Sequence, residues 1–327
     1  MYNKIKEYIA DDLELFEKEL NSLLQSEMYL LNVVLNYVNS NCGKRLRPIM
    51  MMLISKLFTH SEHIYYEKLI DFAVAVETLH QATLIHDDVV DDSKERRSKA
   101  SVNSIYDNKI SVLLGDYMFS VAFNCMYKHR NFEIMDAAAH TLKTMSEGEL
   151  FALELSNNLL HTEETYYKVI YSKTASLIEF SCKIPALIYS DSIELVEVLS
   201  EYGKNIGIAF QMRDDLFDYT DDNKLIGKPV GNDIKEHQIT LPLIYALNHC
   251  SATERERILS ILKLAIISDA QVKDIISFTK VMGGLEYAEK KAKDFVNRAI
   301  SCLDIFPDGL EKDMLIYAAH YMIDRTK

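Results

Sequence analysis

Apolar residues recur along most of the chain at the three- and four-residue spacing of an α-helix. Within residues 71–90, Phe72, Val76 and Leu79 follow this spacing, and further apolar residues lie beside them. More than one face of the predicted helix is therefore apolar. Such a pattern is typical of a helix buried in the middle of a bundle.

Residues 201–220 predict a second buried helix. Its glycines at 203 and 207 each cost helix stability, by about 1 kcal/mol relative to alanine, so we expect a neighbouring helix to approach closely there. The main passages without helical periodicity are residues 93–104 and 221–240. Only 10 glycines and 5 prolines occur, which disfavours turn-rich β architectures. We predict an all-α protein, a single large helical bundle.

Composition excludes several classes of protein. With 327 residues and no low-complexity linker, we expect one domain spanning 1–327. The net charge of −13 argues against general binding of nucleic acid. The five cysteines are widely spaced, as in a cytoplasmic protein with reduced thiols. Because no signal peptide is visible and no apolar run approaches ~20 residues, we expect no integral membrane segment.

Two short stretches, HDDVVD and RDDLFD, repeat the same arrangement of aspartates. With 24 aspartates in the chain, D-D-x-x-D arises by chance about 0.1 times. Residues four apart share a helix face, and carboxylates crowded there repel one another unless a cation lies between them. Oxygen ligands alone favour a hard ion such as Mg²⁺. A solvated acidic face is the alternative. The six candidate ligands are Asp87, Asp88, Asp91, Asp214, Asp215 and Asp218.

A di-iron bundle would need two E-x-x-H motifs, and only one occurs, at residues 77–80. Basic residues instead favour bound phosphate: Arg96 and Arg97 follow the first aspartates, and guanidinium groups suit phosphate oxygens. No nucleotide-binding glycine loop is present. Further candidate phosphate ligands are Lys44 and Arg47, just before a helix whose start Pro48 marks, and Lys173, Thr174 and Lys228.

In these motifs the chain resembles the trans-isoprenyl (polyprenyl) diphosphate synthases, particularly the octaprenyl and other long-chain enzymes. The resemblance covers nearly the whole chain. It rests on GKRLRP (43–48), ETLHQATLIHDDVVD (77–91) followed by RR (96–97), SVLLGDY (111–117), Lys173-Thr174, and FQMRDDLFDY (210–219) followed by GKPVGND (227–233).

The resemblance implies an all-α bundle around a deep cavity, usually a homodimer, that condenses isopentenyl diphosphate head-to-tail with an allylic diphosphate. Asp87, Asp91 and Asp214 would be the principal ligands of three Mg²⁺ ions, and Asp88, Asp215 and Asp218 would support them. The isopentenyl diphosphate would be bound by Lys44, Arg47, His80 and Arg97. The allylic diphosphate would be bound by Arg96, Lys173, Thr174, Gln211 and Lys228. Pyrophosphate leaves with help from the metal and the cations, so no protein nucleophile is required.

Product length is the next expectation. Ala82 and Thr83 lie one helical turn before Asp87, where short-chain relatives tend to carry an aromatic residue, so a growing chain should pass. Phe119, Phe123 and Met126 are candidates for the floor of the cavity, with ordinary core packing as the alternative. We expect a product of around eight isoprene units, as for quinone side chains.

Two departures and several alternatives remain. Ser98 and Gln238 stand where relatives commonly have glycine and lysine, and the second change puts one diphosphate contact in doubt. A short-chain (farnesyl or geranylgeranyl) synthase, or a non-catalytic subunit of a heteromeric synthase, are the alternatives. A non-catalytic subunit should have lost one aspartate motif, and a terpene cyclase should lack GKRLRP and RR.

Overall fold

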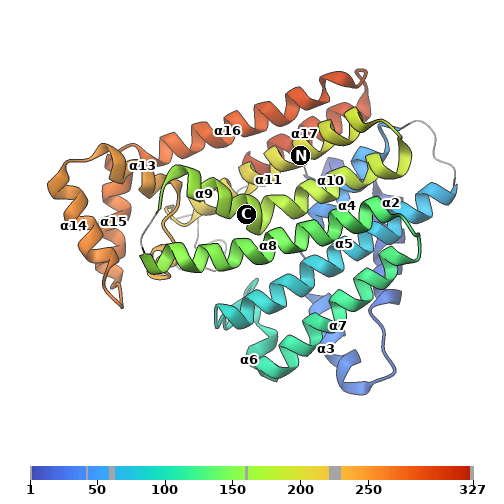
Figure 1. Cartoon of the computed structure of the whole chain (residues 1–327), viewed down its shortest axis with the longest axis horizontal. Coiled ribbons are helices and arrows are strands. Elements are labelled where there is room, and N and C mark those ends of the chain that lie inside the picture. Colours follow the sequence, from blue (N-terminus) through green and yellow to red (C-terminus); the bar gives the residue numbers. More distant parts are fainter. Residues whose placement is uncertain (1, 42, 59–62, 159–160, 221–229, 325–327) are drawn as a thin grey trace. The chain divides into compact units, whose positions relative to one another are not determined.

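The computed structural model describes residues 2–41, 43–58, 63–158, 161–220 and 230–324. The described chain is almost entirely helical (Figure 1), which confirms the all-α prediction. It forms two compact units. The first comprises residues 1–140, 177–200 and 303–318, and the second comprises residues 141–176, 201–302 and 319–327. The prediction of a single domain stays a prediction.

The first unit contains the amino-terminal helices, one short hairpin and parts of three later helices. Its elements are α1 (Tyr2–Tyr8), α2 (Ala10–Leu23), α3 (Tyr29–Ser40), α4 (Leu46–Ser55), α5 (His63–Val90), β1 (Glu95–Arg96), β2 (Lys99–Ala100), α6 (Val102–Tyr106), α7 (Asn108–Tyr127), the start of α8 (Phe132–Asn158), α10 (Ser176–Tyr189), the start of α11 (Ile193–Phe217), η3 (Leu303–Ile305) and much of α17 (Leu310–Asp324).

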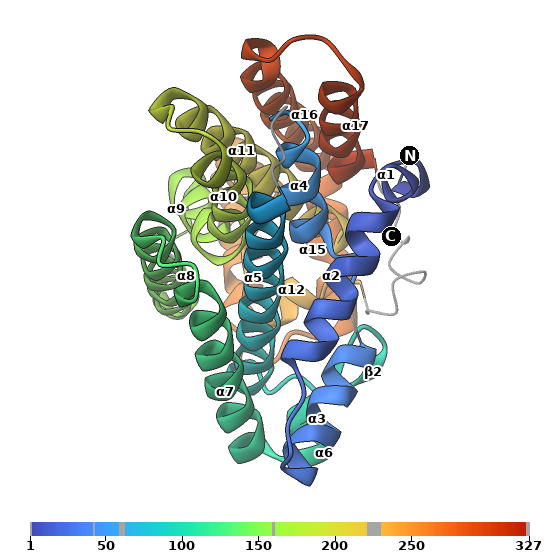
Figure 2. The same cartoon turned by 90° about the vertical axis from the view of Figure 1, so that its right-hand side faces the viewer.

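Helix α5 forms the centre of the first unit. Every residue from 72 to 79 is buried, as the apolar pattern on more than one face predicted. Helices α2 and α7 lie along it (Figure 2). A Cβ added to Gly115 of α7 would lie 2.1 Å from His86 Nε2, so this glycine allows the two helices to approach closely. Near the other end of the contact, Cys125 Sγ donates to Asp71 O at 3.4 Å. Helices α5 and α7 therefore run antiparallel.

A two-stranded antiparallel hairpin follows α5, with Glu95 paired to Ala100 and Arg96 to Lys99. Its turn residues, Arg97 and Ser98, have φ angles of 54° and 60°. Non-glycine residues adopt this left-handed region at a cost, so surrounding contacts must hold the turn. Serine thus occupies a position whose backbone angle suits the glycine that relatives commonly have.

The second unit is a separate helical core. Its complete elements are α9 (Glu163–Ile170), the π-helix η1 (Tyr171–Ala175), α12 (Asn232–Lys235), α13 (Leu241–His249), α14 (Ala252–Leu262), α15 (Asp269–Val281) and α16 (Gly284–Cys302). A continuous apolar cluster links residues of α9, α11, α13, α14, α15 and α16. A Cβ on Gly284 would lie 2.3 Å from Pro242 O, so the start of α16 packs directly on α13.

The two passages predicted to lack helix do so only in part. Residues 93–104 contain the hairpin but also the start of α6, and residues 232–235 form the single turn of α12. Residues 221–229 lie outside the described residues. Local periodicity misses such short turns because they contain too few apolar positions to define a face.

Within the described residues one helix, α7, is long and apolar enough to cross a membrane by length and composition. The expectation from the sequence was that no apolar run would approach this length. The signal is weak, because core helices of soluble proteins pass the same test. No disulfide links the described cysteines, in agreement with the expected reduced thiols.

Candidate functional site

The first aspartate motif lies at the carboxyl end of α5, in the first unit. Asp91 follows the last helical residue, yet its backbone N–H donates to Asp87 O at 2.8 Å. The helical turn is therefore completed, and Asp87 and Asp91 stand one turn apart, as the spacing predicted. Asp87 is half-buried and Asp91 is exposed. Both carboxylates lie at an end of the helix that solvent reaches.

Asp88 has a different environment, since only 3% of it is exposed. Its Oδ1 accepts from Arg96 Nε at 2.8 Å and pairs with Nη2 at 2.7 Å. Its backbone carbonyl accepts from Asn103 Nδ2 at 3.1 Å. Asp88 thus connects α5 to the hairpin that carries the two arginines, while Asp87 and Asp91 stay accessible.

Arg97 connects the hairpin to the GKRLRP segment. Its Nη1 donates to Asn41 O at 2.8 Å, and a Cβ added to Gly43 would lie 2.4 Å from its Nη2. The backbone carbonyl of Lys44 accepts from Tyr2 OH at 2.7 Å. Arg97 therefore lies against the segment that carries Lys44, and its charge also lowers the pKa of Arg47. All three cationic residues are predicted to bind isopentenyl diphosphate.

Arg47 and His80 carry the electrostatic signs of an anion site. Burial lowers the pKa of Arg47 to about 10, against the opposing effect of the Glu77 carboxylate. Its buried Nε has no hydrogen-bond partner among the described residues. Burial, and then the charges of Arg47 and Arg97, lower the pKa of His80 well below its usual value. His80 is neutral at pH 7, and a diphosphate would supply the missing acceptor for Arg47.

The second aspartate motif lies at the end of α11, in the second unit. Asp214 is half-buried, whereas Asp215 is 6% exposed. Asp215 accepts from Gln211 Nε2 at 2.8 Å and from Tyr166 OH at 2.7 Å. Burial is the main reason that the pKa of Asp215 is raised to about 7. Burial likewise raises the pKa of Tyr166 well above its usual value, so this phenol keeps the proton that it donates.

Asp218 binds the amino end of α12. Its Oδ1 accepts from the backbone N–H groups of Gly231 and Asn232 at 3.1 and 3.0 Å, and its Oδ2 accepts from Asp233 N at 3.1 Å. Gly231 has a φ of 78°, and a Cβ there would lie 2.1 Å from Val272 Cγ1, so only glycine fits. The carboxylate is only 7% exposed. The carboxylate of Asp218 therefore caps the amino end of α12.

The predicted Lys173-Thr174 pair lies on the π-helix η1. Such bulges in helices are frequent at functional sites. A Cβ on Gly148 of α8 would lie 2.3 Å from Ser172 Cβ, and one on Gly207 of α11 would lie 2.5 Å from Ala175 Cα. The predicted close approach at Gly207 is thus confirmed. Both neighbouring helices contact this segment closely.

Polar contacts continue from η1 to the second aspartate motif. Thr174 Oγ1 donates to Gln211 Oε1 at 2.8 Å, and Gln211 in turn donates to Asp215. Lys173 pairs with Glu149 of α8 at 2.8 Å. Thr174 and Gln211 are therefore brought to the aspartates of their unit, and Lys173 is held beside them by an acid that the sequence analysis did not single out.

The donor chemistry of both motifs fits a hard divalent cation. Every candidate ligand is a carboxylate, and oxygen ligands of this kind suit a hard ion. The described residues contain no group of three or more histidine, cysteine, aspartate or glutamate side chains already arranged around a metal. Phosphate oxygens and water would have to complete the coordination, which is how Mg²⁺ is usually bound.

Comparison with known proteins decides the family. The family described as Polyprenyl synthetase matches residues 28–279. The chain is 32% identical over 324 residues to the octaprenyl diphosphate synthase of Escherichia coli (strain K12), covering 99% of each protein. The chain belongs to the polyprenyl synthetase family. It is therefore a prenyltransferase, as the motifs predicted.

Solved structures agree with this family. A decaprenyl diphosphate synthase from Rhodobacter capsulatus superposes with a TM-score of 0.90 at 30% identity, over 100% of both chains. A polyprenyl synthase from Caulobacter crescentus CB15, complexed with calcium and isoprenyl diphosphate, gives a TM-score of 0.91 at 28% identity, over 100% of this chain and 98% of that one. The polyprenyl synthetase fold thus extends over the whole chain.

In this polyprenyl synthetase, the residues predicted to set product length lie on α5 and α7. Ala82 is fully buried, and Thr83 donates through Oγ1 to His80 O at 2.8 Å. The Phe119 ring lies 5.5 Å from the His86 ring, beside the aspartate end of α5. Phe119 therefore lies nearer the aspartates than Phe123 and Met126, which come later along α7, and its role in the floor of the cavity stays a prediction. Met126, fully buried, and Phe123 remain as the deeper candidates.

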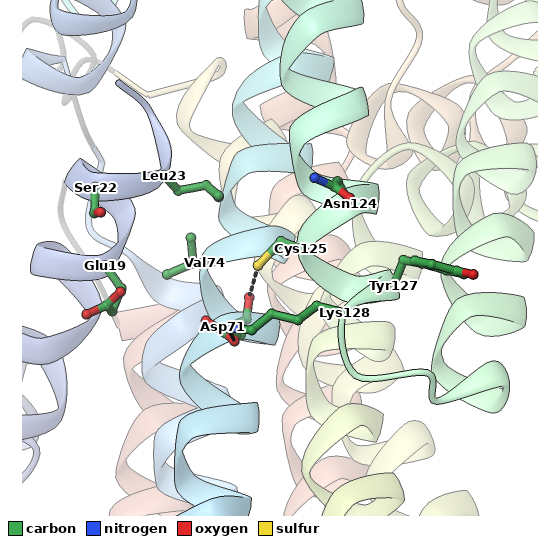
Figure 3. A pocket seen from close by; sticks show the side chains of 9 residues that line it. All are labelled: Glu19, Ser22, Leu23, Asp71, Val74, Asn124, Cys125, Tyr127 and Lys128. Carbon is green, nitrogen blue, oxygen red and sulfur yellow. Dashed lines mark hydrogen bonds and ion pairs between the residues drawn. The ribbon is translucent and has the colours of Figure 1, made fainter. Parts of the chain in front are cut away.

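A cavity of about 520 Å³ lies at the end of the α5–α7 contact that is far from Asp87, and Figure 3 shows the residues that line it. Asp71 lies 16 residues before Asp87, which is about 24 Å along a helix. The lining includes Glu19, Asp71 and Lys128, and Lys128 Nζ donates to Asp71 Oδ2 at 2.9 Å. Charged walls do not suit a hydrocarbon chain, so this cavity is not itself a prenyl tunnel.

Three residues that contact the predicted site residues were not predicted from the sequence. Tyr166, Glu149 and Asn103 lie far in sequence from the groups that they contact, so no local spacing could reveal them. Gln238 is exposed, its Nε2 donates to Glu236 Oε2 at 3.4 Å, and its backbone N–H donates to Asp233 O at 2.8 Å. The expected weakening of one diphosphate contact at this position stays a prediction. Lys228, a predicted allylic diphosphate ligand, lies outside the described residues.

Proposed function

We propose that this prenyltransferase is a Mg²⁺-dependent trans-polyprenyl diphosphate synthase that joins isopentenyl diphosphate head-to-tail to an allylic diphosphate and releases pyrophosphate. One observation carries this function: each aspartate motif keeps an accessible carboxylate, Asp87 or Asp214, beside a buried one held by its own donors, Asp88 or Asp215. This is the arrangement expected of outer carboxylates that bind cations and inner ones that orient them.

The first unit would bind isopentenyl diphosphate. Lys44, Arg47 and Arg97 would bind its phosphate oxygens, and the unpaired Nε of Arg47 supports this role. Neutral His80 adds a hydrogen bond without adding charge. Arg96, paired with Asp88, would turn part of its guanidinium to the allylic diphosphate. In the second unit, Lys173, Thr174 and Gln211 would bind the same allylic group.

Three Mg²⁺ ions, held by Asp87, Asp91 and Asp214, would supply Lewis acidity for the departure of pyrophosphate. The cationic side chains stabilise the negative charge that develops on the leaving group. No protein nucleophile takes part, because the double bond of isopentenyl diphosphate attacks the allylic carbon as its bond to pyrophosphate breaks. The cation left on the isopentenyl unit would lose a proton to the departing pyrophosphate, which restores an alkene. Asp88, Asp215 and Asp218 would fix the metal-binding carboxylates by holding the surrounding backbone and side chains.

We propose a medium-to-long product of around forty carbons, for a quinone side chain. Small residues at 82 and 83 support this length, because neither side chain would obstruct a chain growing past them. Relatives named octaprenyl and decaprenyl diphosphate synthases support it too. A short-chain synthase or a non-catalytic subunit of a heteromeric enzyme are the alternative outcomes of the experiment below.

We further propose a cytoplasmic homodimer. Large apolar side chains are exposed on α6 and α7, including Ile105 at 46%, Val112 at 42% and Leu113 at 59%. A surface of this kind is typical of an interface between subunits. A second copy of the chain would cover this surface, which would also account for the apolar composition of α7 without a membrane.

The decisive experiment is incubation of the purified protein with Mg²⁺, labelled isopentenyl diphosphate and farnesyl diphosphate. We expect a ladder of products ending near forty carbons, and we expect Ala82→Phe to shorten it while leaving the first condensation active. A wild-type enzyme that stops at fifteen or twenty carbons would contradict only the length. A wild-type protein inactive with every allylic primer would contradict the catalytic function and favour a partner-dependent subunit.

A further inference from the structure

The GKRLRP segment contains three cationic residues, Lys44, Arg45 and Arg47. Arg45 differs from the other two in its backbone and its burial. Arg45 has a φ of 55° and immediately precedes α4. Its side chain is only 5% exposed, which is unusual for an arginine. A strained backbone and a buried charge at one position must be held by specific contacts.

Those contacts are supplied by two glutamates. Arg45 Nε donates to Glu17 Oε1 at 2.9 Å, and its Nη2 donates to Glu17 Oε2 at 3.2 Å, which is a two-point contact. Arg45 Nη1 donates to Glu77 Oε1 at 2.9 Å. Asn39 Oδ1 accepts from Nη2 at 3.2 Å. With these donors engaged, Arg45 is not available to phosphate.

Glu77 lies where it can influence the proposed diphosphate ligands. It is 3% exposed and stands one helical turn before His80 on α5. Its carboxylate pairs with Arg45 and also opposes the lowering of the pKa of Arg47. One buried carboxylate therefore contacts the residue between Lys44 and Arg47, and electrostatically favours the charged form of Arg47.

We propose that Arg45, clamped by Glu17 of α2 and Glu77 of α5, is the positioning residue of the isopentenyl diphosphate site: it fixes the turn from which Lys44 and Arg47 reach the substrate and does not contact the substrate itself. This role presupposes the proposed condensation, because the substrate of Lys44 and Arg47 is taken from it. It gives Glu77 a role in substrate binding instead of a purely structural one.

The test is a comparison of Michaelis constants for the two substrates. In Glu77→Gln and Arg45→Lys, we expect KM for isopentenyl diphosphate to rise about tenfold or more, as for other residues that orient binding groups, with KM for the allylic primer changed less than about twofold. Asp12→Asn is the matched control. Asp12 is a buried carboxylate on the same helix as Glu17, and it pairs with Lys56 at 2.8 Å away from this turn.

The double variant Arg45→Met/Glu77→Gln separates positioning from stability. Removing both charges leaves no unpaired buried charge between them, so the melting temperature should recover relative to Arg45→Met alone. KM for isopentenyl diphosphate should nevertheless stay raised. If KM returns to the wild-type value together with stability, or if both Michaelis constants rise equally, Arg45 is merely structural and the proposed role is wrong.

Failure of the condensation itself is distinguishable. If the wild-type protein makes no product, calorimetric titration with isopentenyl diphosphate still measures the role of Arg45, because Glu77→Gln should bind it about tenfold more weakly than the wild type. Equal binding by the two proteins would overturn the role of Arg45. Product formation with unchanged Michaelis constants would overturn it too, while leaving the proposed condensation intact. If Arg45→Lys does not fold, Glu17→Gln removes only the two-point contact and replaces it in the same comparison.

Discussion

The two aspartate motifs have the same sequence pattern but different surroundings. In the first, the inner carboxylate, Asp88, is neutralised by a cation, Arg96. In the second, the inner carboxylate, Asp215, receives hydrogen bonds from two neutral groups, Tyr166 and Gln211, and has a pKa of about 7. The same pattern therefore produces an ion-paired carboxylate in one unit and a carboxylate with a raised pKa in the other.

The last aspartate of each motif differs as well. Asp91 is exposed and completes a helical turn through its backbone, whereas Asp218 is 7% exposed and accepts from the backbone of the loop at 231–233. Equivalent letters in a repeated motif thus perform unequal physical tasks. We expect the symmetry of the two motifs to hold for Asp87 and Asp214 and to fail for the other positions.

The largest expected effect tests Asp87 and Asp214, the positions at which the two motifs are expected to act alike. Asp87→Ala and Asp214→Ala should each lower kcat about 10³-fold, because each removes a carboxylate that would hold a cation against the leaving pyrophosphate. Steady-state turnover of labelled isopentenyl diphosphate measures this loss. Asp136→Ala, at an exposed aspartate of α8, is the control and should keep wild-type turnover. A loss of only a few-fold in one of the two variants would show that the motifs contribute unequally.

The second effect tests the contrast between Asp88 and Asp215. In chelator, without divalent cations, the free energy of unfolding should fall by a few kcal/mol as the pH rises from 5 to 8, since each unit of pKa difference contributes ~1.4 kcal/mol. The folded-state pKa of Asp215 is raised from its usual 3.8 to about 7. The protonated form is thus favoured by folding, and its stabilising contribution is lost as the pH rises through 7.

Urea unfolding at several pH values measures this dependence. Asp215→Asn, which mimics the protonated group, should flatten the dependence between pH 5 and 8. Asp88→Asn should leave the slope in place, because Asp215 is intact in that variant. An equal slope in the wild type and in Asp215→Asn would mean that another group causes the pH dependence, and the contrast between the two inner carboxylates would be lost.

Much of the fold followed from local pattern. The buried helix at 71–90 was predictable because apolar residues on several faces require burial, and the close approach at Gly207 was predictable because glycine inside a helix needs a reason. The π-helix and the hairpin were not predictable. Each depends on contacts with residues far away in sequence, such as Gly148 against Ser172 and Tyr37 OH donating to Ala100 O at 2.5 Å.

In the candidate site, too, local features were predictable from the sequence and long-range contacts were not. Spacing alone placed Asp87 and Asp91 on one turn, because helical geometry is local. Spacing did not reveal that Arg45 pairs with two carboxylates, since these pairs depend on Glu17 and Glu77 from two other helices. Sequence therefore indicates which residue types gather at the site. Tertiary contacts decide which of them bind substrate and which hold the others in position.

The smallest effect tests the contrast between Asp91 and Asp218 through stability. Asp218→Ala should lower the free energy of unfolding by about 2 kcal/mol, because the backbone N–H groups at 231–233 lose a charged acceptor. Asp91→Ala should cost less than about 0.5 kcal/mol, since a carboxylate that is exposed to solvent contributes little to stability. Urea unfolding in chelator measures both values.

Amide exchange localises the change. Asp218→Ala should accelerate exchange at Gly231 and Asn232, and Asp218→Asn, which keeps one oxygen acceptor, should accelerate it less. Equal losses of stability in Asp91→Ala and Asp218→Ala would contradict the contrast between the two motif ends. Unequal losses in stability combined with equal losses in turnover would sharpen the contrast. Asp218 would then act on catalysis through the amino end of α12, and Asp91 through the cation that it binds.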